Sequence, residues 1–154
     1  MTNIDAIEYF DRHLKENTAN GNMHPGENWY ERDYREAEDM VVKFSDLHWQ
    51  GLKNIFGDRT HIWQEACVFV LGEANTAGSV TMLGDIFVRG TDGIACYAAI
   101  FLSAEDLSRL GVDEQQQIRL RIHDLFSDEK YRNHGDHYLI SLEKMQERLG
   151  GVEG

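Results

Sequence analysis

Proline, cysteine and long apolar runs are all scarce in this sequence. A single proline, Pro25, occurs in 154 residues, so very little blocks helix formation. The only two cysteines, Cys67 and Cys96, lie in apolar stretches, which predicts buried free thiols in a reducing compartment. No apolar run approaches the ~20 residues of a membrane-spanning helix, and alternating strand-like runs are missing. These absences favour a helical protein with no membrane association.

Basic residues are also few. The chain has 15 Lys and Arg against 27 Asp and Glu, for a formal net charge of −12. This charge disfavours nucleic acid and anionic membranes as partners, because both are negatively charged, and it is compatible with a basic protein partner. The first 20 residues are polar and acidic and lack the layout of a signal peptide, which predicts a cytoplasmic location.

Apolar residues recur at helical spacing along the chain. The clearest face places Tyr30 and Tyr34 toward the core and Trp29 at a loop edge, and the helix either runs straight past Ser45 or restarts there. Val68 to Leu71 has the composition of a buried strand, but the spacing from Ile62 onward favours helix. We predict an all-α single domain over 1–154, with seven or eight helices in a HEAT-like or irregular bundle and a frayed tail at 149–154. The predicted face of the clearest helix is formed by Tyr30, Tyr34, Ala37, Val41, Phe44 and His48.

A weak internal repeat runs through the middle of the chain. A shift of 29 residues places Ala66-Cys67 on Ala95-Cys96 and Leu71 on Ile100. With the helix that follows each run, HIWQEACVFVLGE and GIACYAAIFLSA resemble the alternation of HEAT-type helical repeats. Small acidic proteins of this character resemble immunity proteins of bacterial polymorphic and contact-dependent toxin systems. The resemblance covers residues 60–110 and implies no functional residue; the other interpretation is an irregular bundle with two similar buried helices.

No catalytic motif is present. Phosphate-binding glycine loops are missing, and the apolar neighbours of the two cysteines disfavour a nucleophilic thiol. The segment NHGDH brings His134, Asp136 and His137 together, and these are residue types that bind zinc or iron. They lack a second pair of ligands at helical spacing, so we favour a solvated loop and predict no metal site and no cofactor.

Negative charge and aromatic residues coincide between Glu27 and Asp39, where ENWYERDYREAED has six carboxylates and only two arginines. We predict a non-enzymatic protein that neutralises a basic partner, most simply an immunity protein bound to its toxin. The alternatives are a nucleic-acid-mimicking inhibitor of a defence or repair enzyme, and a small helical metalloenzyme that uses the His134 region. The other interpretation of this charged run is a helix face that only contacts solvent, which is the usual case for a run of charges. The predicted partner-binding residues are Glu31, Asp33, Glu36 and Asp39, with a second group at Asp85 and Asp92.

Overall fold

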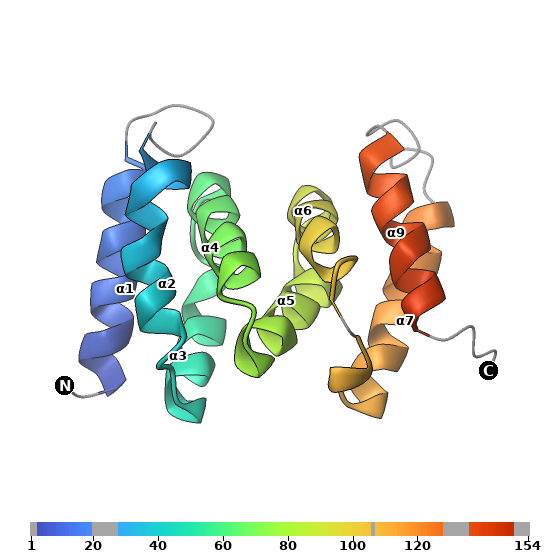
Figure 1. The fold of residues 1–154 in the computed structure, drawn as a ribbon, viewed down its shortest axis with the longest axis horizontal. Coiled ribbons are helices and arrows are strands. Elements are labelled where there is room, and N and C mark those ends of the chain that lie inside the picture. Colours follow the sequence, from blue (N-terminus) through green and yellow to red (C-terminus); the bar gives the residue numbers. More distant parts are fainter. Residues whose placement is uncertain (1–2, 20–27, 106, 128–135, 150–154) are drawn as a thin grey trace. The chain divides into compact units, whose positions relative to one another are not determined.

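All regular secondary structure in the described part of the chain is helical. The computed structural model describes residues 3–19, 28–105, 107–127 and 136–149, and these contain eight α-helices and no strand (Figure 1). The all-α prediction is therefore confirmed, including the helical interpretation of Val68 to Leu71. The chain divides into two compact units, Met1–Met82 and Leu83–Gly154, with the division inside one helix. The single-domain organisation and the HEAT-like stacking of residues 60–110 stay predictions.

The N-terminal unit is built from helices that pack on their second neighbours in the sequence. α1 contacts α3, α2 contacts α4, and α1 also contacts both α2 and α4. In Figure 1, α1 and α2 lie side by side in blue and cyan. The core contains Phe10, Leu52 and Trp63, all at most 1% exposed, and Phe10 meets the ring of Trp63 edge-on at 6.3 Å. The elements are α1 (Asn3–Asn17), the π-helix η1 (Trp29–Asp33), α2 (Tyr34–Val41), α3 (Asp46–Phe56), α4 (His61–Ala74) and the start of α5 (Ala77–Arg89).

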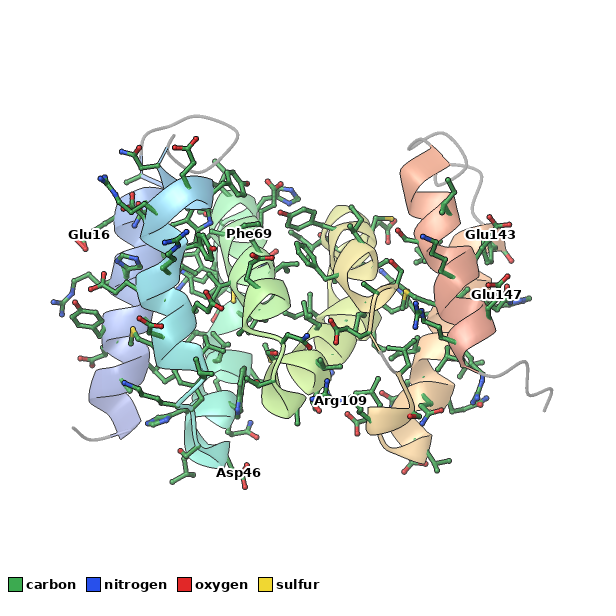
Figure 2. The ribbon with its side chains drawn as sticks, in the orientation of Figure 1. Glu16, Asp46, Phe69, Arg109, Glu143 and Glu147 are labelled. Atoms are coloured by element: carbon green, nitrogen blue, oxygen red, sulfur yellow. The ribbon has the colours of Figure 1, made fainter. Side chains whose placement is uncertain are left out.

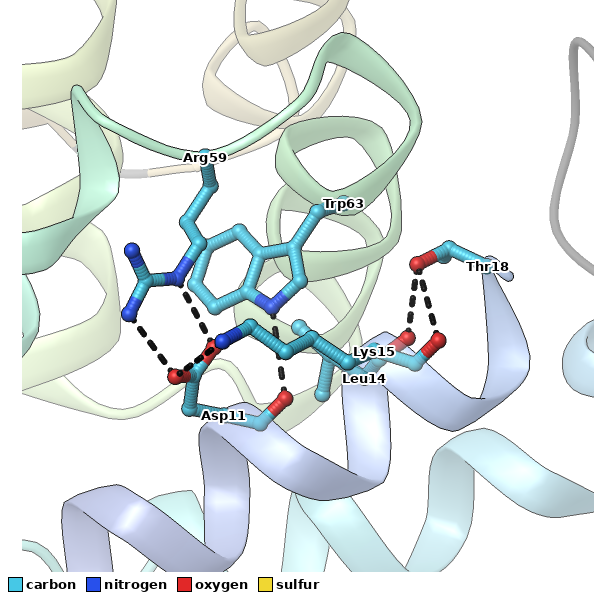
Figure 3. A network of polar contacts seen from close by, with 6 residues as sticks. All are labelled: Asp11, Leu14, Lys15, Thr18, Arg59 and Trp63. Carbon is cyan, nitrogen blue, oxygen red and sulfur yellow. Dashed lines mark hydrogen bonds and ion pairs between the residues drawn. The ribbon is translucent and has the colours of Figure 1, made fainter. Parts of the chain in front are cut away.

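A polar network fastens α1 to the segment that leads into α4. Arg59 donates two hydrogen bonds to the carboxylate of Asp11, at 2.8 and 2.7 Å, while Lys15 pairs with the same carboxylate at 3.3 Å (Figure 3). The indole N–H of Trp63 donates to the backbone carbonyl of Asp11 at 3.4 Å. Burial alone would raise the pKa of the Asp11 carboxyl, but Arg59 and Lys15 outweigh it and hold that pKa below its usual value. The Asp11 side chain is 14% exposed, so the pair is well shielded from water.

Several helices begin at caps made within four consecutive residues. Ser45 and His48 form a reciprocal capping box at the start of α3, and Thr60 accepts from the backbone N–H of Trp63 at the start of α4. Thr76 and Ser79 form the same reciprocal pair before α5, with bonds of 2.7 and 3.0 Å. Ser45 therefore starts a new helix, which settles the question that the sequence left open.

The predicted orientation of the first aromatic residues was wrong. Trp29 is fully buried, whereas Tyr30 is 40% exposed and contacts Phe69 edge-on. The reason is the π-helix, which contains one more residue per turn than an α-helix and shifts the buried face by one position. Ala37 and Val41 keep their predicted places on that face. His48, predicted to continue it, instead caps α3.

The C-terminal unit forms its core around its last helix. α9 contacts α6, α7 and η2, and α7 and α9 lie side by side in orange and red in Figure 1. α7 begins at Val112 after Gly111, and the Glu114 side chain accepts a hydrogen bond from the Gly111 N–H at this end of the helix. Leu149, predicted at the start of the tail, is buried, and 150–154 lie outside the described residues. The elements are α6 (Asp92–Leu102), η2 (Leu107–Arg109), α7 (Val112–Ser127) and α9 (Asp136–Arg148).

Candidate functional site

A pocket of about 390 Å³ lies beside α2 in the N-terminal unit, and we call it the α2 pocket. Its apolar lining comes from three elements: Ala6 on α1, Met40 on α2 and Phe44 in the connection to α3. The remaining lining residues carry polar groups and are Tyr9, Glu36, Asp39, Lys43 and His48. Two of the six predicted partner-binding residues, Glu36 and Asp39, thus line one pocket, and no pattern in the sequence indicated its apolar lining.

Glu36 is held in place by two side chains of α1. Its carboxylate accepts a hydrogen bond from the Tyr9 hydroxyl at 3.2 Å and pairs with His13 Nδ1 at 3.0 Å. His13 Nε2 lies 2.8 Å from the backbone carbonyl oxygen of Asp33, so both ring nitrogens face oxygen acceptors. The nearby charge of Glu36 raises the pKa of the Tyr9 hydroxyl, because it disfavours a second negative charge there. Glu36 therefore already has partners within the chain.

The side chains of Asp39 and Glu31 differ from that of Glu36, because both are exposed and neither forms a hydrogen bond or ion pair with another described residue. Negative charge accumulates around Asp39. Burial raises the pKa of the neighbouring Glu38 carboxyl, and the charges of Glu73 on α4 and of Asp39 raise it further. Asp39 is thus the carboxylate at the α2 pocket whose oxygens remain open to an external donor.

The remaining predicted partner-binding residues have internal ion pairs. Asp33 lies 3.4 Å from Arg32 Nε, at the end of the π-helix. Asp85 pairs with Arg89 at 3.1 Å along α5, and Asp92 pairs with Arg121 at 3.2 Å between α6 and α7. Asp85 and Asp92 belong to the C-terminal unit, so they are not part of the α2 pocket.

The two cysteines are both buried, as predicted. Cys67 on α4 and Cys96 on α6 are at most 1% exposed and form no disulfide. Burial raises the pKa of both thiols, that of Cys96 to about 12, and the nearby charge of Asp92 adds to the shift at Cys96. Neither sulfur is therefore ionised near neutral pH, which removes the form of cysteine that attacks electrophiles.

The histidine-rich segment cannot be placed. His134 and the side chains of Asp136 and His137 lie outside the described part of the structure. Within 3–19, 28–105, 107–127 and 136–149, no three His, Cys, Asp or Glu side chains come together in a way that would hold a metal ion.

Comparison of the chain with known protein families, with curated proteins and with solved structures finds no match. None of the described helices is both long enough and apolar enough to cross a lipid bilayer.

The carboxylates of α2 were recognised as candidates from the sequence, but the residues of α1 that contact Glu36 were not. Tyr9 and His13 lie four residues apart on the exposed-to-intermediate side of α1 and reach Glu36 across 27 and 23 positions of the chain. In the sequence, Tyr9 and His13 are recognisable only as two polar rings four residues apart on one predicted helix. This spacing does not indicate which other helix the two rings contact.

Proposed function

We propose that this protein is a non-enzymatic binding protein that recognises a basic protein partner through the acidic face of α2. The observation that carries the proposal is the combination, at one place, of the apolar α2 pocket with the exposed carboxylate of Asp39, which has no internal partner among the described residues. An apolar centre with a polar rim is the usual composition of a protein-binding surface. A role as an immunity protein that neutralises a bacterial toxin would use such a surface and requires no chemistry of its own.

Electrostatics supports the same proposal over a longer range. The chain has a net charge of −12, and two exposed carboxylates lie on consecutive helices, Glu31 on η1 and Asp39 on α2. Attraction between such groups and a basic partner accelerates association, and salt weakens it because charges are screened beyond about 10 Å at 0.1 M.

The test uses two matched double variants. The partner is captured from a lysate of the host cell on the immobilised protein at low salt, eluted with salt, identified and purified. Its association with wild type, Glu31→Gln/Asp39→Asn and Glu143→Gln/Glu147→Gln is then measured at 50 and 300 mM salt. Glu143 and Glu147 provide the control because both project from exposed positions on α9 (Figure 2). Their replacement by Gln removes the same charge as the double substitution of Glu31 and Asp39.

We expect Glu31→Gln/Asp39→Asn, called the α2 variant below, to weaken binding of the partner by about 1–2 kcal/mol, mainly through slower association. The association rate of this variant should also depend less on salt concentration. The α9 variant should match wild type. Equal losses in both variants would mean that net charge alone attracts the partner. Unchanged affinity in the α2 variant would refute the assignment to this face, and Asp85→Asn/Asp92→Asn would then test the second predicted group.

A further inference from the structure

The α2 pocket has the chemistry of a site for one long cationic side chain. Its floor is apolar, formed by Ala6, Met40 and Phe44, and it would accept the methylene stem of such a side chain. Asp39, the carboxylate at the same pocket with no described partner, would accept hydrogen bonds from the charged end. The volume of about 390 Å³ is sufficient for one side chain and does not indicate a site for a folded element.

An aromatic ring at the pocket distinguishes between the two long cationic side chains, those of arginine and lysine. Tyr9 is 43% exposed and lines the pocket, and its hydroxyl is engaged by Glu36, which keeps the ring in place. The other aromatic residue of the pocket, Phe44, already packs against Phe10 at 5.6 Å and Trp49 at 5.1 Å. A planar guanidinium stacks on an aromatic ring and bonds a carboxylate through two parallel N–H groups, whereas an ammonium does neither as well.

We propose that the α2 pocket binds an arginine side chain of the partner protein, with the guanidinium between the ring of Tyr9 and the carboxylate of Asp39. This inference rests on the proposed function, because it names the residue type that the partner presents to the same face. Lys43 also lines the pocket, four residues after Asp39 and beyond the end of α2, and its positive charge opposes an arginine there. Asp39 and Lys43 therefore act on the occupant with opposite signs.

The test measures binding of small probes by NMR of the methyl groups of Ala6 and Met40, which line the pocket directly. The probes are the N-acetyl N-methylamides of arginine, lysine and citrulline; citrulline has nearly the shape of arginine without its charge. The order of affinity should be arginine, then lysine, then citrulline, with shifts confined to pocket residues. Equal binding of citrulline, a preference for lysine, or shifts elsewhere would overturn the proposal.

Three substitutions give effects of different sign. Asp39→Asn should weaken arginine binding by about threefold, the range of an exposed ion pair, and Lys43→Gln should strengthen it by about twofold. Glu143→Gln, which removes one exposed carboxylate from α9, should leave it unchanged. Tyr9→Leu should reduce the preference for arginine over lysine to the part that comes from the two bonds to Asp39, while Tyr9→Phe, which retains the ring, should keep the full preference. An undiminished preference in folded Tyr9→Leu contradicts the stacking arrangement.

Binding of the purified partner separates this inference from the proposed function. If Glu31→Gln/Asp39→Asn weakens partner binding and Tyr9→Leu and Lys43→Gln do not change it, the acidic face binds the partner but the pocket holds no arginine. If neither set of variants changes partner binding, the proposed function fails at this face, whatever the probes do. Helical circular dichroism of each variant confirms that it is folded.

Discussion

The ion pair between Asp11 and Arg59 should be a principal link between α1 and the rest of the N-terminal unit. The perturbation is a double-mutant cycle of Asp11→Asn, Arg59→Met and the double variant. Met keeps part of the aliphatic stem of Arg59 but also removes the guanidinium from the Trp63 ring, where Cζ lies 5.8 Å from the centroid, and the cycle separates that loss from the coupling to Asp11. The matched control is Glu8→Gln, which removes one carboxylate from an exposed position of the same helix.

The magnitude follows from geometry and burial. Arg59 donates two short hydrogen bonds to Asp11, and the two side chains are 21% and 14% exposed. Exposed pairs are worth ~0.2–1 kcal/mol, while breaking a fully buried pair costs ~3–5 kcal/mol. A shielded bidentate pair with some exposure lies between these limits, so we expect a coupling free energy of about 2 kcal/mol. Glu8→Gln should change stability by less than about 0.5 kcal/mol.

Acid should weaken the same link. The folded pKa of Asp11 lies below its usual value of 3.8, so the folded protein binds fewer protons than the unfolded chain between the two pKa values. The contribution is complete above the unfolded pKa and is lost as the pH falls through the folded pKa. The stability difference between wild type and Asp11→Asn should therefore shrink below about pH 4.

The assay is urea unfolding followed by tryptophan fluorescence. All three tryptophans, Trp29, Trp49 and Trp63, lie in Met1–Met82, so the signal reports the N-terminal unit. A coupling free energy under about 0.5 kcal/mol, or a stability difference that does not change between pH 6 and pH 2.5, would refute the reasoning.

Three further predictions concern packing, capping and the thiols. Gly78→Ala should destabilise the protein by about 1–2 kcal/mol in urea unfolding, because a Cβ there would lie 2.4 Å from Trp49 Nε1 and the clash outweighs the better helix propensity of alanine; unchanged stability would mean that the indole moves aside. Ser45→Ala should cost about 1 kcal/mol in the same measurement through loss of the capping box, and a neutral result would remove the cap from the list of stabilising contacts. Cys67 and Cys96 should react slowly with a thiol reagent in the folded protein and rapidly in denaturant, since both are buried with raised pKa values; fast reaction in the folded state would contradict their burial.

The sequence was sufficient for the helical class and for much of the buried face, because helical spacing of apolar residues is a local property. It failed where one residue altered the local geometry. The π-helix exchanges the roles of Trp29 and Tyr30, and no pattern of apolar residues records an extra residue in a turn. Helix ends marked by capping side chains have a local signal, as Thr60 illustrates at the start of α4.

The candidate site was only half predictable for a different reason. The carboxylates of Glu36 and Asp39 are visible in the sequence as part of a charged run. The apolar floor and the ring of Tyr9 join them only because α1 packs on α2. Packing between helices depends on contacts far apart in the chain, and one sequence contains no direct record of these contacts.

The local caps have a consequence for where each helix starts to form. The first turn of a helix is unfavourable to form, because the backbone dihedral angles of several residues must be fixed before the hydrogen bonds that stabilise them are made. At the starts of α3 and α5, a side chain and a backbone group three residues away supply two of those bonds without any distant contact. Each cap therefore lowers the free-energy cost of the first turn at a defined residue, which fixes where the helix begins. The rest of each helix gains its stability when its apolar face packs against the neighbouring helices.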